Sequence, residues 1–298
     1  MERNLTVGSA GSLAFLKESI PDSVKQSVKA VLFRGGLWNQ RRLSGKGVIN
    51  DLYYWVSDGR RDTLLPLQNY FSVLFPDLET RTEGTLSLFS PQGRLLGEKD
   101  FPVERCGVAK LRIRSVLKEL GIRSPEGYGT FLVILEIPRA VLELLPQQEP
   151  FYFWARFYVA YLSPDQQPCF VHGVDKSVAC PSGGRAPMPF YPAGKRYAWL
   201  PEIPVDMDLY ERLWVILINR TSRPARLTLT VSDAQDRSKR WAARILPSGV
   251  HRFELTPENT RELLLQELRL RVDGMPTPWG RPVVFKEFRN GAISAMHC

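Results

Sequence analysis

The sequence predicts a mainly β protein made of tandem antiparallel β-sandwich units, each with a short helix, preceded by an N-terminal helical segment. Apolar and polar residues alternate with the two-residue period of a strand in many short runs. Turn residues separate these runs, as they do in antiparallel sheets. The order of the runs in the first half of the chain returns in the second half, which indicates an internal duplication.

The composition is that of an ordinary globular protein. The 298 residues are 44% hydrophobic and 24% charged, which argues against wholesale disorder and suits about two domains. No apolar run reaches the roughly 18 residues that span a bilayer, so we expect no membrane insertion. The first 20 residues lack the apolar core of a signal peptide, so we expect a cytoplasmic protein. The net charge of +9 is spread thinly, which favours an acidic partner but disfavours a dedicated nucleic-acid-binding protein.

The N-terminal segment, residues 1–52, has no counterpart in the second half. The stretch Asp22–Phe33 is predicted to be a helix, because its apolar residues recur on one face. A glycine-rich basic stretch follows at 34–47, without the glycine and lysine spacing of a phosphate loop. Two interpretations are open for it: a solvated loop, or a guanidinium clamp in which Arg41 and Arg42, near Trp38, hold a carboxylate or phosphate.

Two homologous units are predicted at residues 53–180 and 197–298, with a proline- and glycine-rich linker at 181–196. Each unit starts with an aromatic triplet whose tryptophan, Trp55 or Trp199, is expected to be a packing anchor. The matching segments are apolar runs at 71–75 and 214–218, strands at 85–89 and 226–231 and at 107–113 and 249–255, helices at 115–120 and 257–268, strands at 131–137 and 268–272, and closing strands at 170–173 and 295–298.

The densest aromatic run, Phe151–Tyr161, is predicted to be one strand of the first unit. Both of its faces are aromatic, so both are expected to be covered. One face is assigned to the core. The other face, which includes Arg156 and Tyr158, either contacts the second unit or a ligand, or also belongs to the core.

Three histidines and four cysteines are the candidates for metal or acid–base chemistry. His172 and His297 end matching strands, which predicts either a functional pair or one structural histidine inherited by both units; we favour the second interpretation. No further ligands cluster around them and no CxxC pair occurs, so no metal is expected. The cysteines are expected to be free thiols, and a Cys–His nucleophile is disfavoured, since neighbours on a strand point to opposite faces.

Short motifs of the second unit follow an order known from one family. They are Trp199 followed by Pro201-Glu202, the strand Ile216-Leu217-Ile218-Asn219, Ala225 with Thr228, the Ser232-Asp233 pair, Pro247 with His251-Arg252-Phe253, and Pro282-Val283-Val284-Phe285 with Arg289. Through these motifs, residues 194–289 resemble the sensory rhodopsin transducer family. The resemblance implies a non-enzymatic β-sandwich that oligomerises and docks on a signalling partner.

This chain departs from the family in its tandem arrangement, its extra N-terminal segment and Lys286-Glu287-Phe288, which replaces a polar stretch of the late strand. The fold is therefore expected to transfer better than the partner. A tandem chain is also expected to form internally some contacts that oligomers make between subunits.

No catalytic motif appears, so the sequence favours a non-catalytic binding or accessory protein. We expect it to recognise a peptide or partner-protein segment, acidic in character, by β-strand addition and Arg or Lys contacts. Two alternatives stay open: a carbohydrate-binding protein, and a small hydrolase or cyclase that uses His172 or His297. No cofactor is expected, and a homo-oligomer is compatible with the sequence. The candidate ligand-binding residues are Trp38, Arg41, Arg42, Arg156, Tyr158, His172 and His297.

Overall fold

The computed structural model describes residues 37–43, 48–124, 126–144, 151–154, 157–165, 167–172, 176–179, 184–187, 196–201, 205–221, 223–275 and 282–297. In 37–43, 48–51, 151–154, 176–179 and 184–187 it describes the backbone alone. The described chain is mainly β and every strand pairing is antiparallel, which confirms the predicted class. Within these residues, no helix has the length and apolar character needed to cross a membrane.

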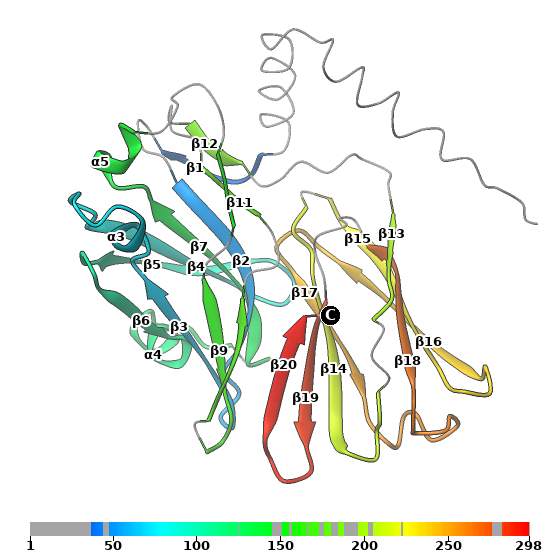
Figure 1. Cartoon of the computed structure of the whole chain (residues 1–298). Helices are drawn as coiled ribbons and strands as arrows, with labels where there is room; N and C mark the ends of the chain where they lie inside the picture. The colour runs from blue at the N-terminus through cyan, green and yellow to red at the C-terminus, as the bar shows by residue number, and fades with distance from the viewer. Residues whose placement is uncertain are drawn as a thin grey trace, which may run out of the picture.

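Four four-stranded sheets make up most of the fold (Figure 1). In the first half, sheet I has the order β2-β7-β4-β5 and sheet II the order β10-β9-β3-β6. Their strands are β2 (Val48–Val56), β3 (Asp62–Gln68), β4 (Thr82–Phe89), β5 (Leu95–Val103), β6 (Val108–Arg112), β7 (Tyr128–Glu136), β9 (Tyr158–Leu162) and β10 (Pro168–His172).

The second half contains sheet III, with the order β13-β18-β15-β16, and sheet IV, with the order β17-β14-β19-β20. Their strands are β13 (Tyr197–Trp199), β14 (Tyr210–Ile218), β15 (Ala225–Ser232), β16 (Ser238–Ile245), β17 (Val250–Leu255), β18 (Arg269–Met275), β19 (Val283–Phe288) and β20 (Ile293–His297).

The strand order of sheets I and II returns in sheets III and IV. When β2 to β7, β9 and β10 are matched in chain order with β13 to β20, sheet I maps onto sheet III and sheet II onto sheet IV. The turns agree as well: Gly107 and Gly249, which open the matched strands β6 and β17, each follow a residue with positive φ, Cys106 at 56° and Ser248 at 61°.

Several elements differ from the sequence-based expectation. Residues 71–75, expected to match the strand at 214–218, form the short helix α3 (Phe71–Leu74), and the strand that corresponds to β14 is β3. A short apolar run does not distinguish a strand from a helix by its period. Here the Asn69 side chain, which donates to the Thr80 carbonyl at 2.7 Å, holds the chain in a turn just before the helix.

The expectation of a helix at 257–268 is wrong. The segment forms successive turns, because Thr256 and Asn259 bind nearby backbone groups and compete with helical hydrogen bonds. Glu267, at a φ of 55°, then reverses the chain into β18. The helix expected at 115–120 is present as α4 (Ile113–Glu119), and a third short helix is α5 (Arg139–Leu142).

The single strand predicted for residues 151–161 is also wrong, because two strands of different sheets lie there. β8 (Phe151–Trp154) pairs with β11 (Lys176–Ala179), whereas β9 belongs to sheet II. Strands also occur where a basic loop and a linker were expected: β1 (Leu37–Leu43) pairs with β12 (Gly184–Pro187). The predicted helix at 22–33 lies outside the described residues.

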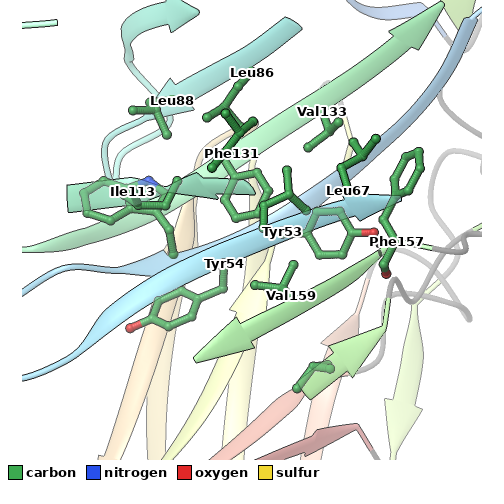
Figure 2. Close-up of a cluster of buried hydrophobic side chains, with 14 of the residues drawn as sticks. Tyr53, Tyr54, Leu67, Leu86, Leu88, Ile113, Phe131, Val133, Phe157 and Val159 are labelled. Atoms are coloured by element: carbon green, nitrogen blue, oxygen red, sulfur yellow. Dashed lines mark hydrogen bonds between the residues drawn. The ribbon is translucent and has the colours of Figure 1, made fainter. Parts of the chain in front are cut away.

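The largest core fills the space between sheets I and II (Figure 2). Figure 2 shows Leu86, Phe131 and Val133 of sheet I with Leu67 and Val159 of sheet II in this cluster. Trp55 is fully buried, and its indole N–H donates to the Thr130 carbonyl at 3.0 Å, as expected of a packing anchor.

Sheet IV contributes to two cores. One face, including Leu213 and Val215, packs with sheet III, and the other, including Trp214 and Phe285, packs against the first half. The Phe285 ring meets Tyr161 of sheet II edge to face at 5.4 Å between centroids. β14 is therefore apolar on both faces, as a strand covered on two sides must be.

Candidate binding surface

Among the residues predicted to bind a ligand, the three whose side chains the structure describes, Tyr158, His172 and His297, lie together, and the Tyr158 and His172 ring centroids are 6.3 Å apart. Trp38, Arg41 and Arg42 lie on β1, whose side chains are outside the description, and Arg156 is not described. Tyr158 is 51% exposed at the start of β9. The guanidinium clamp therefore stays a prediction.

The structure does bring the two matched histidines together. His172 ends β10, His297 ends β20, and their ring centroids lie 4.5 Å apart in an edge-to-face arrangement. Each histidine stands opposite the first residue of the neighbouring hairpin strand, Tyr158 in one half and Val283 in the other. The pair thus marks a junction at which equivalent hairpin positions of the two halves meet.

No group of three His, Cys, Asp or Glu side chains suited to a metal occurs in the described part of the chain. Cys169, a free thiol on β10, is largely buried, and burial raises its pKa to about 11. A thiol with so high a pKa is protonated at neutral pH and is a poor nucleophile.

A concentration of positive charge lies on the outer face of sheet III. Alternation along its strands places Leu227, Leu229 and Val272 in the core and leaves their neighbours outside. Five exposed arginines occupy that outer side, and we call them the arginine face: Arg226, Arg240, Arg244, Arg269 and Arg271.

Small polar residues separate these arginines and keep the surface flat. Thr230 of β15 lies between Arg271 of β18 and Arg240 of β16 in the strand register. Along β15, β16 and β18 this face contains a single carboxylate, Asp273. Asp273 accepts hydrogen bonds from the Arg271 guanidinium at 2.8 Å, and these bonds hold its pKa below the usual value.

One pair of arginines on this face is electrostatically unfavourable. Arg226 and Arg244 are directly opposite in the register of β15 and β16, and both are exposed. Like charges opposite each other in a sheet destabilise it. Such a pair gains stability when an anion lies between or above the two side chains.

The arginine face borders an open sheet edge. β16 is the last strand of sheet III, and within the described ranges it pairs only with β15, over eight residues without a bulge. Arg240, Ala242 and Arg244 are exposed along it. An edge strand of this length presents unpaired backbone N–H and C=O groups to a further strand.

Asp233 fixes the turn that leads into this edge. Its carboxylate accepts the backbone N–H groups of Gln235 and Leu264 and the guanidinium of Arg237 at 2.7 Å. Burial alone would raise the pKa of Asp233, but these hydrogen bonds lower it to about 2. Asp236 takes a positive φ of 58° and closes the turn.

Sequence reasoning missed the arginine face although it identified the strand at 226–231. The alternation of Arg226-Leu227 and of Arg269-Leu270-Arg271-Val272 was the available signal. Arg226 and Arg271 are 45 residues apart in the sequence, however. Only the strand order β18-β15-β16 shows that the arginines share a surface.

No family model and no curated protein matches the sequence. Among solved structures, the chain is similar to a β-glucuronidase of Bacteroides uniformis at 9% identity and a TM-score of 0.19, with 84% of this chain aligned to 26% of that one. A glycosyl hydrolase family 2 member from Bacteroides cellulosilyticus gives 5% identity and a TM-score of 0.15, covering 85% of this chain and 27% of that one. The 7S globulin of Momordica charantia gives 11% identity and a TM-score of 0.13, covering 84% and 74%. This chain spans about a quarter of the β-glucuronidase, and at such TM-scores the similarity carries no argument about fold or function.

Proposed function

We propose that this chain is a non-catalytic binding protein that captures an acidic peptide or partner-protein segment by adding it as a strand to β16. The observation that carries the proposal is the open, unbulged edge of β16 beside five exposed arginines. Backbone hydrogen bonds to the edge would supply affinity that does not depend on side chains. The arginine face would supply the preference for acidic residues.

The strand register defines the preferred ligand. Side chains on one face of a strand recur every second residue, and so do Arg240, Ala242 and Arg244 along β16. A segment with Asp or Glu at every second position would therefore direct its carboxylates to the arginine face. A bound carboxylate would also relieve the repulsion between Arg226 and Arg244.

The rest of the chain suits a scaffold for this edge. We infer that the two pairs of sheets are copies of one β-sandwich unit, on the basis of their common strand order and matched turns. The resemblance of residues 194–289 to a non-enzymatic family points the same way. A cytoplasmic accessory role agrees with the free thiols of Cys106 and Cys169, which a reducing compartment preserves.

The test is isothermal titration of the full chain with an extended peptide that alternates Glu and Thr. We expect binding that weakens with salt and falls about tenfold or more in Arg240→Glu/Arg244→Glu, because charge pairs become repulsive. The matched control is Arg139→Glu, a change of an exposed arginine on α5 with 93% of its side chain accessible, which should bind as the wild type does.

A second peptide separates strand addition from simple charge attraction. N-methylation at alternate residues keeps the carboxylates but removes every backbone donor on one edge of the peptide. Two methylated peptides, one for each edge, are needed, and one of them should lose binding. Equal binding of both methylated peptides and the parent, or unchanged binding by Arg240→Glu/Arg244→Glu, would contradict the proposal.

A further inference from the structure

The matched strands of sheets I and III have opposite charges at equivalent positions. Because β4 corresponds to β15 and β5 to β16, the register places Glu83 where Arg226 stands and Glu98 where Arg240 stands. The outer face of sheet I has Glu83, Glu98, Asp100 and Glu136 on β4, β5 and β7. Lys99, the one basic residue of these three strands, alternates with Glu98 and Asp100 and lies on the other face of β5, where it pairs with Glu119. We call these four carboxylates the acidic face.

The acidic face also borders an open edge. β5 is the last strand of sheet I, as β16 is the last strand of sheet III, and among the described residues it pairs only with β4. Glu98 and Asp100 are exposed on it. Pro102 lacks an N–H group and would end any added ladder at that point.

The two edges face away from each other. β5 lies on one side of the molecule and β16 on the opposite side, with the other strands between them (Figure 1). A single chain therefore cannot bring its own β5 to its own β16, whereas two chains can make this contact.

We infer that the segment captured by β16 is β5 of a second copy of this chain, joined so that sheet III of one copy continues into sheet I of the next. This inference rests on the proposed function, since it names the partner of the same edge. An antiparallel pairing with Arg240 opposite Asp100 places Ala242 opposite Glu98, and Glu98 is then diagonal to Arg244. Arginine side chains reach across both distances.

The contact is heterologous, because it joins two different surfaces of the chain. Each copy retains one free β5 and one free β16, so association continues until a ring closes or a filament grows. The repulsion between Arg226 and Arg244 would be relieved in the joined sheet.

The experiment compares full-length variants by sedimentation velocity over a concentration series at low salt. Arg240→Glu/Arg244→Glu and Glu98→Arg/Asp100→Arg are each expected to weaken self-association about tenfold or more. An equimolar mixture of the two should associate, because β16 of each variant is complementary in charge to β5 of the other. The unchanged β16 pairs with the unchanged β5, and the reversed β16 pairs with the reversed β5. The variant with all four changes should regain self-association, and Arg139→Glu should behave as the wild type.

Peptide titration separates failure of this inference from failure of the proposed function. Glu98→Arg/Asp100→Arg keeps the arginine face and should still bind the alternating Glu-Thr peptide. A wild type that stays monomeric while this variant binds peptide would overturn the self-association and leave the proposed function standing. Loss of peptide binding in this variant, with circular dichroism unchanged, would contradict the proposed function instead. Self-association in all variants alike would overturn the role of both edges.

Discussion

At the scale of single residues, Glu287 shows how the two halves are joined. Its carboxylate is buried and lies within 4 Å of three guanidiniums: Arg212 of β14 at 3.3 Å, and Arg61 at 3.5 Å and Arg60 at 3.7 Å in the turn before β3. Arg61 also stacks over Trp214 at 4.4 Å. The late-strand sequence that departs from the resembled family thus supplies the central carboxylate of an ion-pair cluster between the halves.

Replacing Glu287 should therefore cost stability. Glu287→Ala leaves three arginines around a site without a carboxylate, and we expect a loss of about 3 kcal/mol in the free energy of unfolding by urea. Glu254 also pairs with Arg212, at 3.2 Å, but is 45% exposed. Glu254→Ala should change stability by less than about 1 kcal/mol, and equal losses in the two variants would contradict the role given to burial.

A second residue-scale prediction concerns His251. Burial, and then the nearby charge of Arg252, lower its pKa from 6.5 in the folded chain. The unfolded chain therefore binds more protons below pH 6.5, so this group makes the fold less stable as the pH falls through that range. His251→Gln should flatten the stability–pH curve there; a curve parallel to that of the wild type would show that His251 does not titrate as described.

At the scale of elements, the β15–β16 hairpin is the part on which the proposed binding depends. Asp233 holds its turn by accepting hydrogen bonds from the backbone N–H groups of Gln235 and Arg237 in the turn and of Leu264 in a distant loop. The corresponding turn in the first half uses Ser90 and Arg94 in the same way, with Gly93 at a φ of 80°. The turn is thus a shared feature of both halves, but only in the second does a buried carboxylate hold it.

Asp233→Asn tests that dependence. The amide N–H₂ group cannot accept the hydrogen bonds that one carboxylate oxygen now receives, so the turn loses a connection to Leu264. We expect the Tm to fall by several degrees, faster amide exchange at 233–240, and weaker peptide binding. Asp236→Asn, which keeps a residue that tolerates positive φ, is the control. Unchanged exchange in Asp233→Asn would contradict the assignment.

The lowered pKa of Asp233 predicts how the stability of the fold changes at acid pH. Its pKa of about 2 in the folded chain lies below the ordinary aspartate value of 3.8. The lowered pKa adds stability that is complete above pH 3.8 and is lost as the pH falls towards 2. The wild type should therefore lose stability relative to Asp233→Asn on acidification through this window, measured by thermal unfolding. A constant difference between the two proteins would contradict this.

Strands with clear two-residue alternation could be predicted from the sequence, whereas a run that is apolar throughout is ambiguous: the run at 214–218 lies in β14, but the run at 71–75 is not a strand. The strands at 85–89, 107–112 and 226–231 alternate and were identified. The run at 71–75 is apolar throughout and became α3, because Asn69 sets a turn before it. The candidate surface was missed for another reason: Arg226, Arg240 and Arg271 meet only through the order of strands in sheet III, which no local pattern contains.

At the scale of the whole molecule, sheet IV makes the halves mutually dependent. Trp214, Ile216 and Phe285 belong to the same core as Leu65 and Phe131 of the first half, and their strand neighbours belong to the core of sheet III. Val250 donates its N–H to the Pro91 carbonyl at 2.9 Å, which ties the turns of the halves together. These contacts join the two halves through sheet IV and through their turns.

The last prediction is that the halves unfold as one cooperative unit. Phe285 is 1% exposed, touches Tyr161 across the junction and packs beside Trp214 of its own sheet. Phe285→Ala should remove about 3–5 kcal/mol of stability. Because β7 and β15 lie on opposite sides of this junction, hydrogen exchange in both strands should accelerate by the same factor. The control Leu200→Ala, at a residue 59% exposed, should leave both unchanged. Faster exchange in β15 with an unaffected β7 would show instead that each half folds independently, and that sheet IV only rests against its neighbour.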